Sequence, residues 1–120
     1  MRFNFLINYE FNFFAKIINK NMIKRLVKLT FQADKTDDFI QIFETSKDKI
    51  RAMSGCQHVE LLRDATTPTI FFTLSLWDTE GSLDAYRQSD LFRTTWAKTK
   101  ILFADKPAAW TTTLISVAVA

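Results

Sequence analysis

Residues 69–77, with the sequence TIFFTLSLW, constrain the fold more than any other segment of this chain. Their side chains alternate with a period of two, which is the pattern of a β-strand. One side of this strand is wholly apolar, with Ile70, Phe72, Leu74 and Leu76, and the other carries Phe71, Thr73, Ser75 and Trp77. A strand with so much apolar surface on both sides is expected at the centre of a sheet.

Three other segments have strand character. Residues 23–32 alternate, and one face carries Ile23, Arg25, Val27, Leu29 and Phe31. Residues 57–63 lead into a turn at 64–68, which predicts a β-hairpin with the central strand. Residues 110–117 follow Lys106-Pro107, which ends the preceding helix, and are rich in Thr, Ile and Val, so they predict the last strand.

Two segments with helical spacing connect these strands. Thr36, followed by Asp37 and Asp38, offers an N-cap and first-turn acids for a helix that ends at Ser54-Gly55. The apolar stripe of this helix consists of Phe39, Ile42, Phe43, Ile50 and Met53. In the second segment Asp78 or Thr79 caps a first part and Ser89-Asp90 caps a second part, so we expect a break near Ser89.

The elements therefore follow the order β-α-β-β-α-β. This order predicts one α+β domain over residues 22–117 with ferredoxin-like topology, preceded by an extension at 1–21 and followed by a tail at 118–120. Because each crossover is right-handed, both helices should cover the same face of a four-stranded antiparallel sheet. We expect the open face to carry Leu26, Phe71, Trp77 and several of Thr30, Thr73, Ser75, Thr111 and Thr113. A face of this kind predicts a symmetric homodimer in which a second copy covers it.

Residues 1–21 differ in composition from the rest and consist mostly of Phe, Asn, Ile, Lys and Tyr. Asparagines and Glu10 interrupt every apolar run, so the segment predicts neither a signal peptide nor a membrane helix. Its apolar residues alternate, which leaves an extra edge strand as one alternative. All five favoured residues have AT-rich codons, and we therefore expect a non-functional translated leader ahead of a start at Met22.

Composition and charge exclude several classes of protein. Hydrophobic residues make up 48% and charged residues 24% of the chain, as in ordinary soluble domains. The net charge of +3 is spread among alternating acids and bases, which gives little support to nucleic-acid binding. One cysteine, Cys56, allows no internal disulfide, and without a His/Cys cluster or an acidic constellation we expect no metal site. We expect a reducing, cytoplasmic location.

Several short motifs from Met22 onward occur in a recognisable order. They are Ser54-Gly55-Cys56, the Thr67-Pro68 turn, Leu76-Trp77-Asp78-Thr79, Leu83-Asp84-Ala85-Tyr86 and Ser89-Asp90-Leu91-Phe92. This order resembles the antibiotic biosynthesis monooxygenase family of dimeric α/β-barrel proteins. The resemblance implies oxidation of a small aromatic or quinol substrate by molecular oxygen without metal or flavin. The family also contains domains with no demonstrated turnover, so the resemblance alone leaves an enzyme activity open.

A heme-degrading branch of the same family has an Asn in the first strand and a Trp and a His spaced ten residues apart. Val27, Tyr86 and Trp96 stand at those places here. No axial ligand for a heme remains, so we do not expect heme degradation and expect no cofactor.

Oxygenation without a cofactor requires an apolar pocket, a group that helps to form the phenolate, and a donor that stabilises the oxygenated intermediate. Tyr86 and His58 are the candidate catalytic residues. Tyr86 precedes the helix break, and His58 is the one histidine, whose ordinary pKa suits acid-base chemistry near neutrality. The candidate substrate-binding residues are Trp96, Phe92, Phe72, Leu74, Val27 and Phe31.

Each candidate has a structural alternative. An aromatic stripe at helical spacing is also the pattern of a plain core, and Tyr86 fits a boundary position with its hydroxyl in water. The sequence does not show whether His58 lies on the face of the sheet that meets the helices. Val59 and Leu61, on the other side of its strand, are equally apolar and could meet them instead. Trp77 is expected at a strand-helix junction or a dimer contact, and Cys56 as a small buried residue.

Two functions are consistent with these residues. A cofactor-independent monooxygenase acting on a small phenol or quinol predicts a cavity between helices and sheet, with Tyr86 or His58 projecting into it. A non-catalytic dimeric barrel that binds a small apolar ligand or serves as a scaffold predicts that Phe92, Trp96 and Phe72 fill that space. Nucleic-acid binding would need exposed aromatic residues on the open face, where dimerisation hides them.

Overall fold

The structure, a computed structural model, describes residue 15 and residues 19–120 of the chain. Its elements in chain order are β1 (Ile23–Thr30), α2 (Thr36–Arg51), β2 (Cys56–Arg63), β3 (Ile70–Trp77), α3 (Glu80–Arg87), α4 (Asp90–Lys100) and β4 (Ala108–Thr113). This order confirms the ferredoxin-like α+β fold, with the second helical segment divided near Ser89 as predicted. The expectations for residues 1–14 and 16–18 lie outside the described residues.

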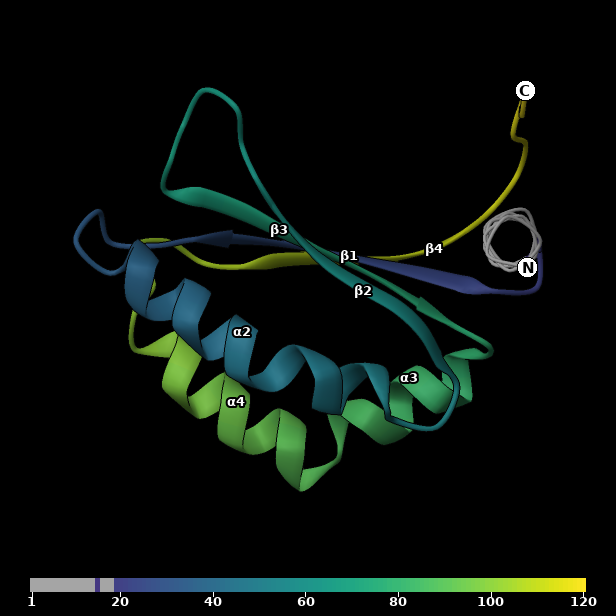
Figure 1. The fold of residues 1–120 in the computed structure, drawn as a ribbon, viewed down its shortest axis with the longest axis horizontal. Helices are drawn as coiled ribbons and strands as arrows, with labels where there is room; N and C mark the ends of the chain where they lie inside the picture. The colour runs from purple at the N-terminus through teal and green to yellow at the C-terminus, as the bar shows by residue number, and fades with distance from the viewer. Residues whose placement is uncertain (1–14, 16–18) are drawn as a thin grey trace, which may run out of the picture.

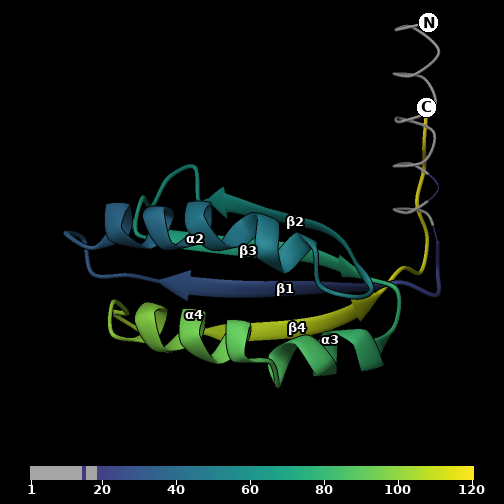
Figure 2. The same cartoon turned by 60° about the horizontal axis from the view of Figure 1, so that its bottom comes forward.

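The strands form one antiparallel sheet in the order β2-β3-β1-β4. The strand with two apolar sides, β3, is central, and β2 and β4 are the edges. The three helices of residues 19–120 cover one face of this sheet, and no helix in this part of the chain covers the opposite face (Figures 1 and 2). The ferredoxin-like topology thus places every helix on the same side, as the handedness of the crossovers requires.

The covered side of β3 is the opposite of the one that we expected. Phe71 and Trp77 are only 2% and 0% exposed, and they pack in the core beneath the helices. Phe72 and Leu74 pair with Lys28 and Leu26 of β1 on the uncovered side. Alternation defines the two sides of a strand, but both sides of β3 are apolar, so the pattern could not show which of them the helices cover.

Two groups of buried residues occupy the two ends of the space between helices and sheet. The first group consists of Leu29, Phe31, Phe39, Phe43, Phe71 and Leu102. The second consists of Ile23, Ile50, Cys56, Trp77 and Leu83. The middle of β3 lies between these groups, and its side chains facing the helices are those of Thr73 and Ser75.

Most helices and strands begin and end near the residues that the sequence predicts. Thr79 and Ser89 cap α3 and α4, and each side chain accepts a hydrogen bond from a backbone N–H three residues on. The N-cap of α2 is Lys35 instead of Thr36, and no side chain caps this helix. Strand β4 ends at Thr113 and not at Val117, because Thr113 already pairs with Ile23, the first residue of β1.

Gly55 makes the tight connection between α2 and β2. Its φ of +83° lies in the left-handed region, which glycine adopts without a steric penalty. Its carbonyl oxygen accepts a hydrogen bond of 2.8 Å from the Asp78 N–H. A Cβ atom at this position would lie 2.3 Å from Oγ of Ser82, so the close approach of this turn to α3 requires glycine.

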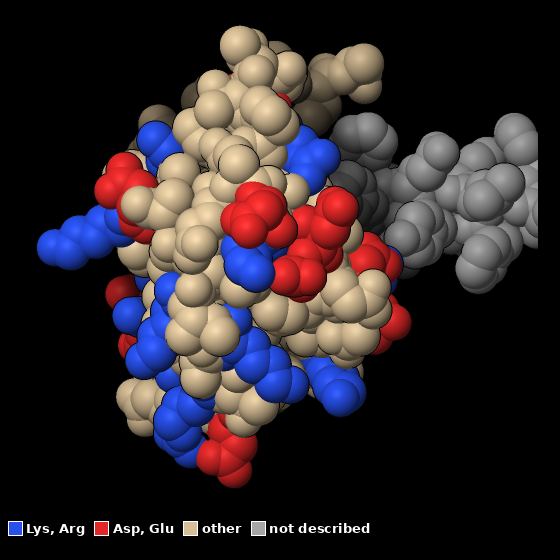
Figure 3. Space-filling model, turned by 90° about the vertical axis from the view of Figure 1, so that its left-hand side faces the viewer, with Lys and Arg blue, Asp and Glu red and all other residues tan. Residues whose placement is uncertain are grey.

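Two surface properties bear on function. No helix in residues 19–120 is long and apolar enough to cross a membrane. Acidic and basic side chains both occur on the end of the molecule drawn in Figure 3, so this end is not uniformly basic.

Candidate functional site

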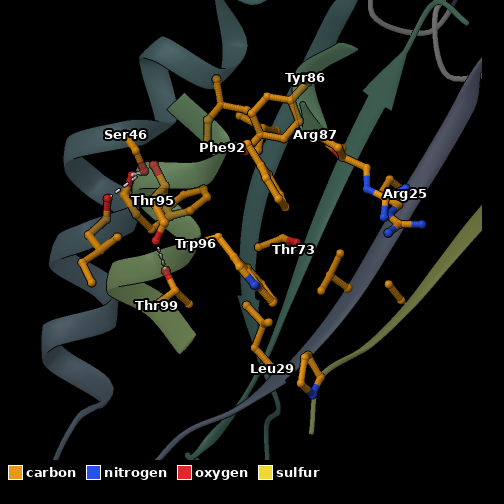
Figure 4. Close-up of a pocket in the computed structure, with 18 of the residues that line it drawn as sticks. Arg25, Leu29, Ser46, Thr73, Tyr86, Arg87, Phe92, Thr95, Trp96 and Thr99 are labelled. Atoms are coloured by element: carbon orange, nitrogen blue, oxygen red, sulfur yellow. Dashed lines mark hydrogen bonds between the residues drawn. The ribbon is translucent and has the colours of Figure 1, made fainter. Parts of the chain in front are cut away.

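A cavity of about 380 Å³ lies between the helices and the middle of the sheet (Figure 4). The side chains of β3 explain its position. Phe71 and Trp77 fill the two ends of the covered face, whereas Thr73 and Ser75 between them are small. The next strand, β1, adds Arg25, Val27 and Leu29, of which Val27 lies opposite Thr73. The space that Thr73 and Ser75 leave has the size of a small-molecule pocket.

An aromatic wall faces this floor. It consists of Tyr86 from α3 and of Phe92 and Trp96 from α4. The ring of Phe92 meets that of Tyr86 edge to face at 5.3 Å and lies parallel to that of Trp96 at 5.9 Å. Trp96 also contacts Phe103 edge to face at 5.5 Å. Rings in contact on both sides have little freedom, so the wall keeps its shape without a ligand.

Ser89, between α3 and α4, fixes two members of this wall. Its Oγ donates a hydrogen bond of 2.6 Å to the carbonyl oxygen of Tyr86. The same Oγ accepts a hydrogen bond of 3.1 Å from the N–H of Phe92. The break between the helices therefore sets the positions of Tyr86 and Phe92 relative to one another.

The aromatic wall carries two polar groups, the Tyr86 hydroxyl and the indole N–H of Trp96. Burial is the main cause that raises the pKa of Tyr86 to about 12, with a smaller contribution from Cys56. The phenol is therefore neutral at physiological pH and can donate a hydrogen bond, but it cannot act as a general base there. Among the described residues, none forms a hydrogen bond with this hydroxyl.

Two other hydroxyl groups at the cavity are engaged within their own helices. Ser46 Oγ donates to the carbonyl oxygen of Ile42 at 2.7 Å, and Thr99 Oγ1 donates to that of Thr95 at 2.8 Å (Figure 4). The side chain of Thr73 on the floor makes no such bond with any described residue. The Thr95 hydroxyl also forms no hydrogen bond with another described residue, so Thr73, Tyr86 and Thr95 carry the lining hydroxyl groups that are free to bind a ligand.

Two arginines lie together at one side of the cavity, Arg25 from β1 and Arg87 from α3 (Figure 4). Arg25 Nη1 donates a hydrogen bond of 2.7 Å to Oγ1 of Thr111. Burial, and then the charge of Arg87, lower the pKa of Arg25, although a guanidinium stays charged at any ordinary pH. The described residues that line the cavity include no Asp, Glu or His.

The structure brings four of the predicted site residues together, namely Tyr86, Phe92, Trp96 and Val27. Phe31 is only 1% exposed and does not line the cavity, but it stacks at 4.2 Å on Phe39, which does.

The other predicted site residues lie elsewhere. Phe72 and Leu74 cannot form the floor of the cavity, since they belong to the uncovered face of β3. His58 pairs with Leu76 on that same uncovered face, and its Nε2 lies 2.8 Å from Oε1 of Glu60.

Sequence reasoning missed Arg25, Arg87 and Thr73 as lining residues. A signal for Arg25 was present, because it shares the apolar side of its strand with Ile23 and Val27. A charge on such a side is unusual and indicates a cavity or a partner. In the described part of the chain no cluster of three or more His, Cys, Asp or Glu side chains could hold a metal ion.

The fold and the cavity define a class: ferredoxin-like α+β domains that hold a ligand-sized aromatic cavity between the sheet and its helices. The antibiotic biosynthesis monooxygenase family matches residues 22–98 of this sequence, and the chain belongs to that family. No individually curated protein matches the sequence.

Solved structures share the fold. A proposed antibiotic biosynthesis monooxygenase from Nitrosomonas europaea is 16% identical, with a TM-score of 0.76 over 82% of this chain and 94% of that one. One from Caulobacter crescentus CB15 is 21% identical, with a TM-score of 0.75 over 81% and 92%. A single-residue mutant of SnoaB from Streptomyces nogalater, a cofactor-independent oxygenase, is 11% identical, with a TM-score of 0.73 over 81% and 96%. Identities this low show a common fold alone.

Proposed function

We propose that this protein is a cofactor-independent monooxygenase that oxidises a small aromatic phenol or quinol. The observation that carries the proposal is the cavity of about 380 Å³ with its wall of Tyr86, Phe92 and Trp96. The scaffold alternative predicts that Phe92, Trp96 and Phe72 fill the space themselves, but Phe92 and Trp96 line an open cavity and Phe72 is not among its lining residues. Membership of the family, and the cofactor-independent activity of SnoaB on the same fold, support the same choice.

The reaction needs no external reductant when the substrate supplies the electrons. In a substrate such as anthrone, a ring methylene becomes a carbonyl and its two C–H bonds break. One atom of molecular oxygen forms the new C=O bond, and the other leaves as water with the two hydrogens. Carbon loses four electrons and oxygen gains four, so the step balances. Loss of one methylene proton converts anthrone into the phenolate of its enol form, and this anion is rich enough in electrons to begin the transfer.

The residues of the cavity have distinct roles in this proposal. Phe92 and Trp96 hold the aromatic ring of the substrate and exclude water. The neutral hydroxyl of Tyr86 donates a hydrogen bond to the reduced oxygen as negative charge develops there. The lining contains no carboxylate or imidazole among the described residues, so the substrate reacts as an anion formed in solution or at the cavity mouth. His58 has no role in this scheme, because it lies on the other face of the sheet.

A non-catalytic barrel that binds a small apolar ligand is the second candidate function. The absence of an acid or a histidine from the described lining residues is the observation that favours it. Oxygen consumption with anthrone and naphthohydroquinone distinguishes the two functions. The oxygenase predicts that the protein raises oxygen uptake well above the spontaneous rate. If every substrate that binds is oxidised only at the spontaneous rate, the oxygenase is refuted and the binding function is supported.

We also propose that a second copy of the chain covers the open face of the sheet. This face carries Leu26, Phe72 and Leu74 on the central strands. Leu62 and Trp110 on the edge strands are 44% and 47% exposed. An apolar surface of this extent is unusual on a monomer. Light scattering at micromolar concentration should give twice the mass of the chain, and a stable monomer would refute the proposal.

A further inference from the structure

Two positive charges converge on one side of the cavity, and a single described carboxylate, that of Asp84, acts on both of them. Arg25 points from β1 and Arg87 from the last turn of α3 toward the same region (Figure 4). No ion pair links Arg25 to any described carboxylate. Arg87 forms a long ion pair with Asp84, whose Oδ1 lies 3.9 Å from Nη1. The charge of Asp84 also acts on Arg25, but less than burial and the charge of Arg87 do, so the group of three keeps one unbalanced positive charge.

Such an arrangement is unfavourable in the empty protein. Each guanidinium keeps its charge, and the two charges repel each other where water is partly excluded. The lowered pKa of Arg25, whose causes are burial and the charge of Arg87, is consistent with that repulsion. A bound anion between the two groups would relieve it. One bond of Arg25, to Thr111, orients its guanidinium and leaves further N–H donors free.

The geometry points to an aromatic carboxylate as the ligand. Its ring lies against Phe92 and Trp96, and its two oxygens accept hydrogen bonds from Arg25 and Arg87. A carboxylate matches the planar fork of a guanidinium, and the apolar remainder of the cavity suits a ring that bears its charge at one edge. This inference rests on the proposed function for the placement of the ring, and it specifies the substrate class as a phenol or quinol that also carries a carboxylate.

Calorimetric binding of naphthoate and naphthamide tests this assignment, because the two probes have nearly the same shape and differ in charge. The wild-type protein should bind naphthoate at least about tenfold more tightly, since hydrogen bonds to charged groups are the strong ones. Arg25→Gln and Arg87→Gln should each remove most of that preference. The dissociation constant for naphthamide should stay within about twofold of the wild-type value in each variant. This result would show that each variant retains the folded cavity.

Arg93→Gln is the matched control. Arg93 lies on α4, does not line the cavity, and its side chain is 63% exposed next to Asp90. This variant loses the same charge and should keep the preference for naphthoate. The inference is wrong if the wild-type protein shows no preference, if it binds neither probe, or if the preference survives in both cavity variants.

Binding requires no turnover, so this test separates the inference from the proposed function. Selective binding of naphthoate, together with oxygen consumption no faster than the spontaneous rate with dihydroxynaphthoate and naphthohydroquinone, would refute the oxygenase and keep the carboxylate site. Oxidation of naphthohydroquinone and of dihydroxynaphthoate with equal kcat/KM would keep the oxygenase and refute the carboxylate site.

Discussion

The ring of Tyr86 stacks on that of Trp77, with the centroids 5.1 Å apart and the planes inclined by 23°. Trp77 is fully buried at the end of β3, and its Nε1–H donates a hydrogen bond of 2.9 Å to Oγ of Ser75 on the cavity floor. Floor and wall are thus connected through one indole. Trp77 has no place in the cavity lining, but it positions the residue that we propose as the hydrogen-bond donor.

Replacing this indole should lower the stability of the protein. In Trp77→Phe the smaller ring leaves a void and loses the bond to Ser75, so we expect the free energy of unfolding to fall by about 2–3 kcal/mol. Ser75→Ala removes only the hydrogen-bond acceptor and should cost about 1 kcal/mol. Urea unfolding measures both values. Equal stability of Trp77→Phe and the wild type would contradict the role of Trp77 as the support of Tyr86.

Tyr86→Phe tests the proposed donor with little change in shape. The stack on Trp77 and the contact with Phe92 persist, so stability and KM should change little. The rate constant kcat for oxygen uptake should fall by about 10- to 100-fold, because removal of one donor to a developing oxyanion has effects of this order or larger. An unchanged kcat would remove Tyr86 from the mechanism.

His58→Ala is the companion to that variant. Because His58 lies on the uncovered face beside Glu60, we expect kcat in this variant to stay within about twofold of the wild-type value. A large loss of kcat in a variant that still forms the dimer would contradict this expectation and would show that His58 takes part in catalysis.

The order of elements could be predicted from the sequence because periodicity, caps and glycine positions are local signals. The side of β3 that meets the helices could not, since Phe71 and Trp77 compete with Phe72 and Leu74 and only packing decides between them. The same ambiguity placed Phe72 and Leu74 wrongly in the candidate site and left the side of His58 open. Arg25 and Arg87 lie far apart in sequence and meet only after the sheet and α3 have formed.

The raised pKa of Tyr86 predicts a loss of stability at alkaline pH. An unfolded tyrosine loses its proton near pH 10, whereas Tyr86 in the folded protein keeps it until about 12. Unfolding therefore releases a proton in this interval, and the free energy of unfolding falls as pH rises from about 10 to 12. The contribution is on the order of 1–2 kcal/mol after allowance for partial exposure. Tyr86→Phe should flatten this part of the pH profile in urea unfolding, and an unaltered slope would contradict the burial of the phenol.

Ser89→Ala tests the connection between α3 and α4. The variant loses the cap of α4 and the bond to the Tyr86 carbonyl, so we expect a loss of about 1–2 kcal/mol in stability. Thr79→Ala is the matched control, since it removes the cap of α3 away from the aromatic wall and should cost about 1 kcal/mol. Only Ser89→Ala should weaken the binding of naphthamide, and equal binding by both variants would show that Ser89 does not position the wall.

The most direct test of the monooxygenase proposal is mass spectrometry of the product formed from anthrone under isotopically labelled molecular oxygen. We predict one labelled atom in the new carbonyl of anthraquinone, formed in the presence of the protein well above the spontaneous rate and more slowly with Tyr86→Phe. Formation of labelled product at the spontaneous rate, although anthrone binds in the cavity, would contradict the proposal.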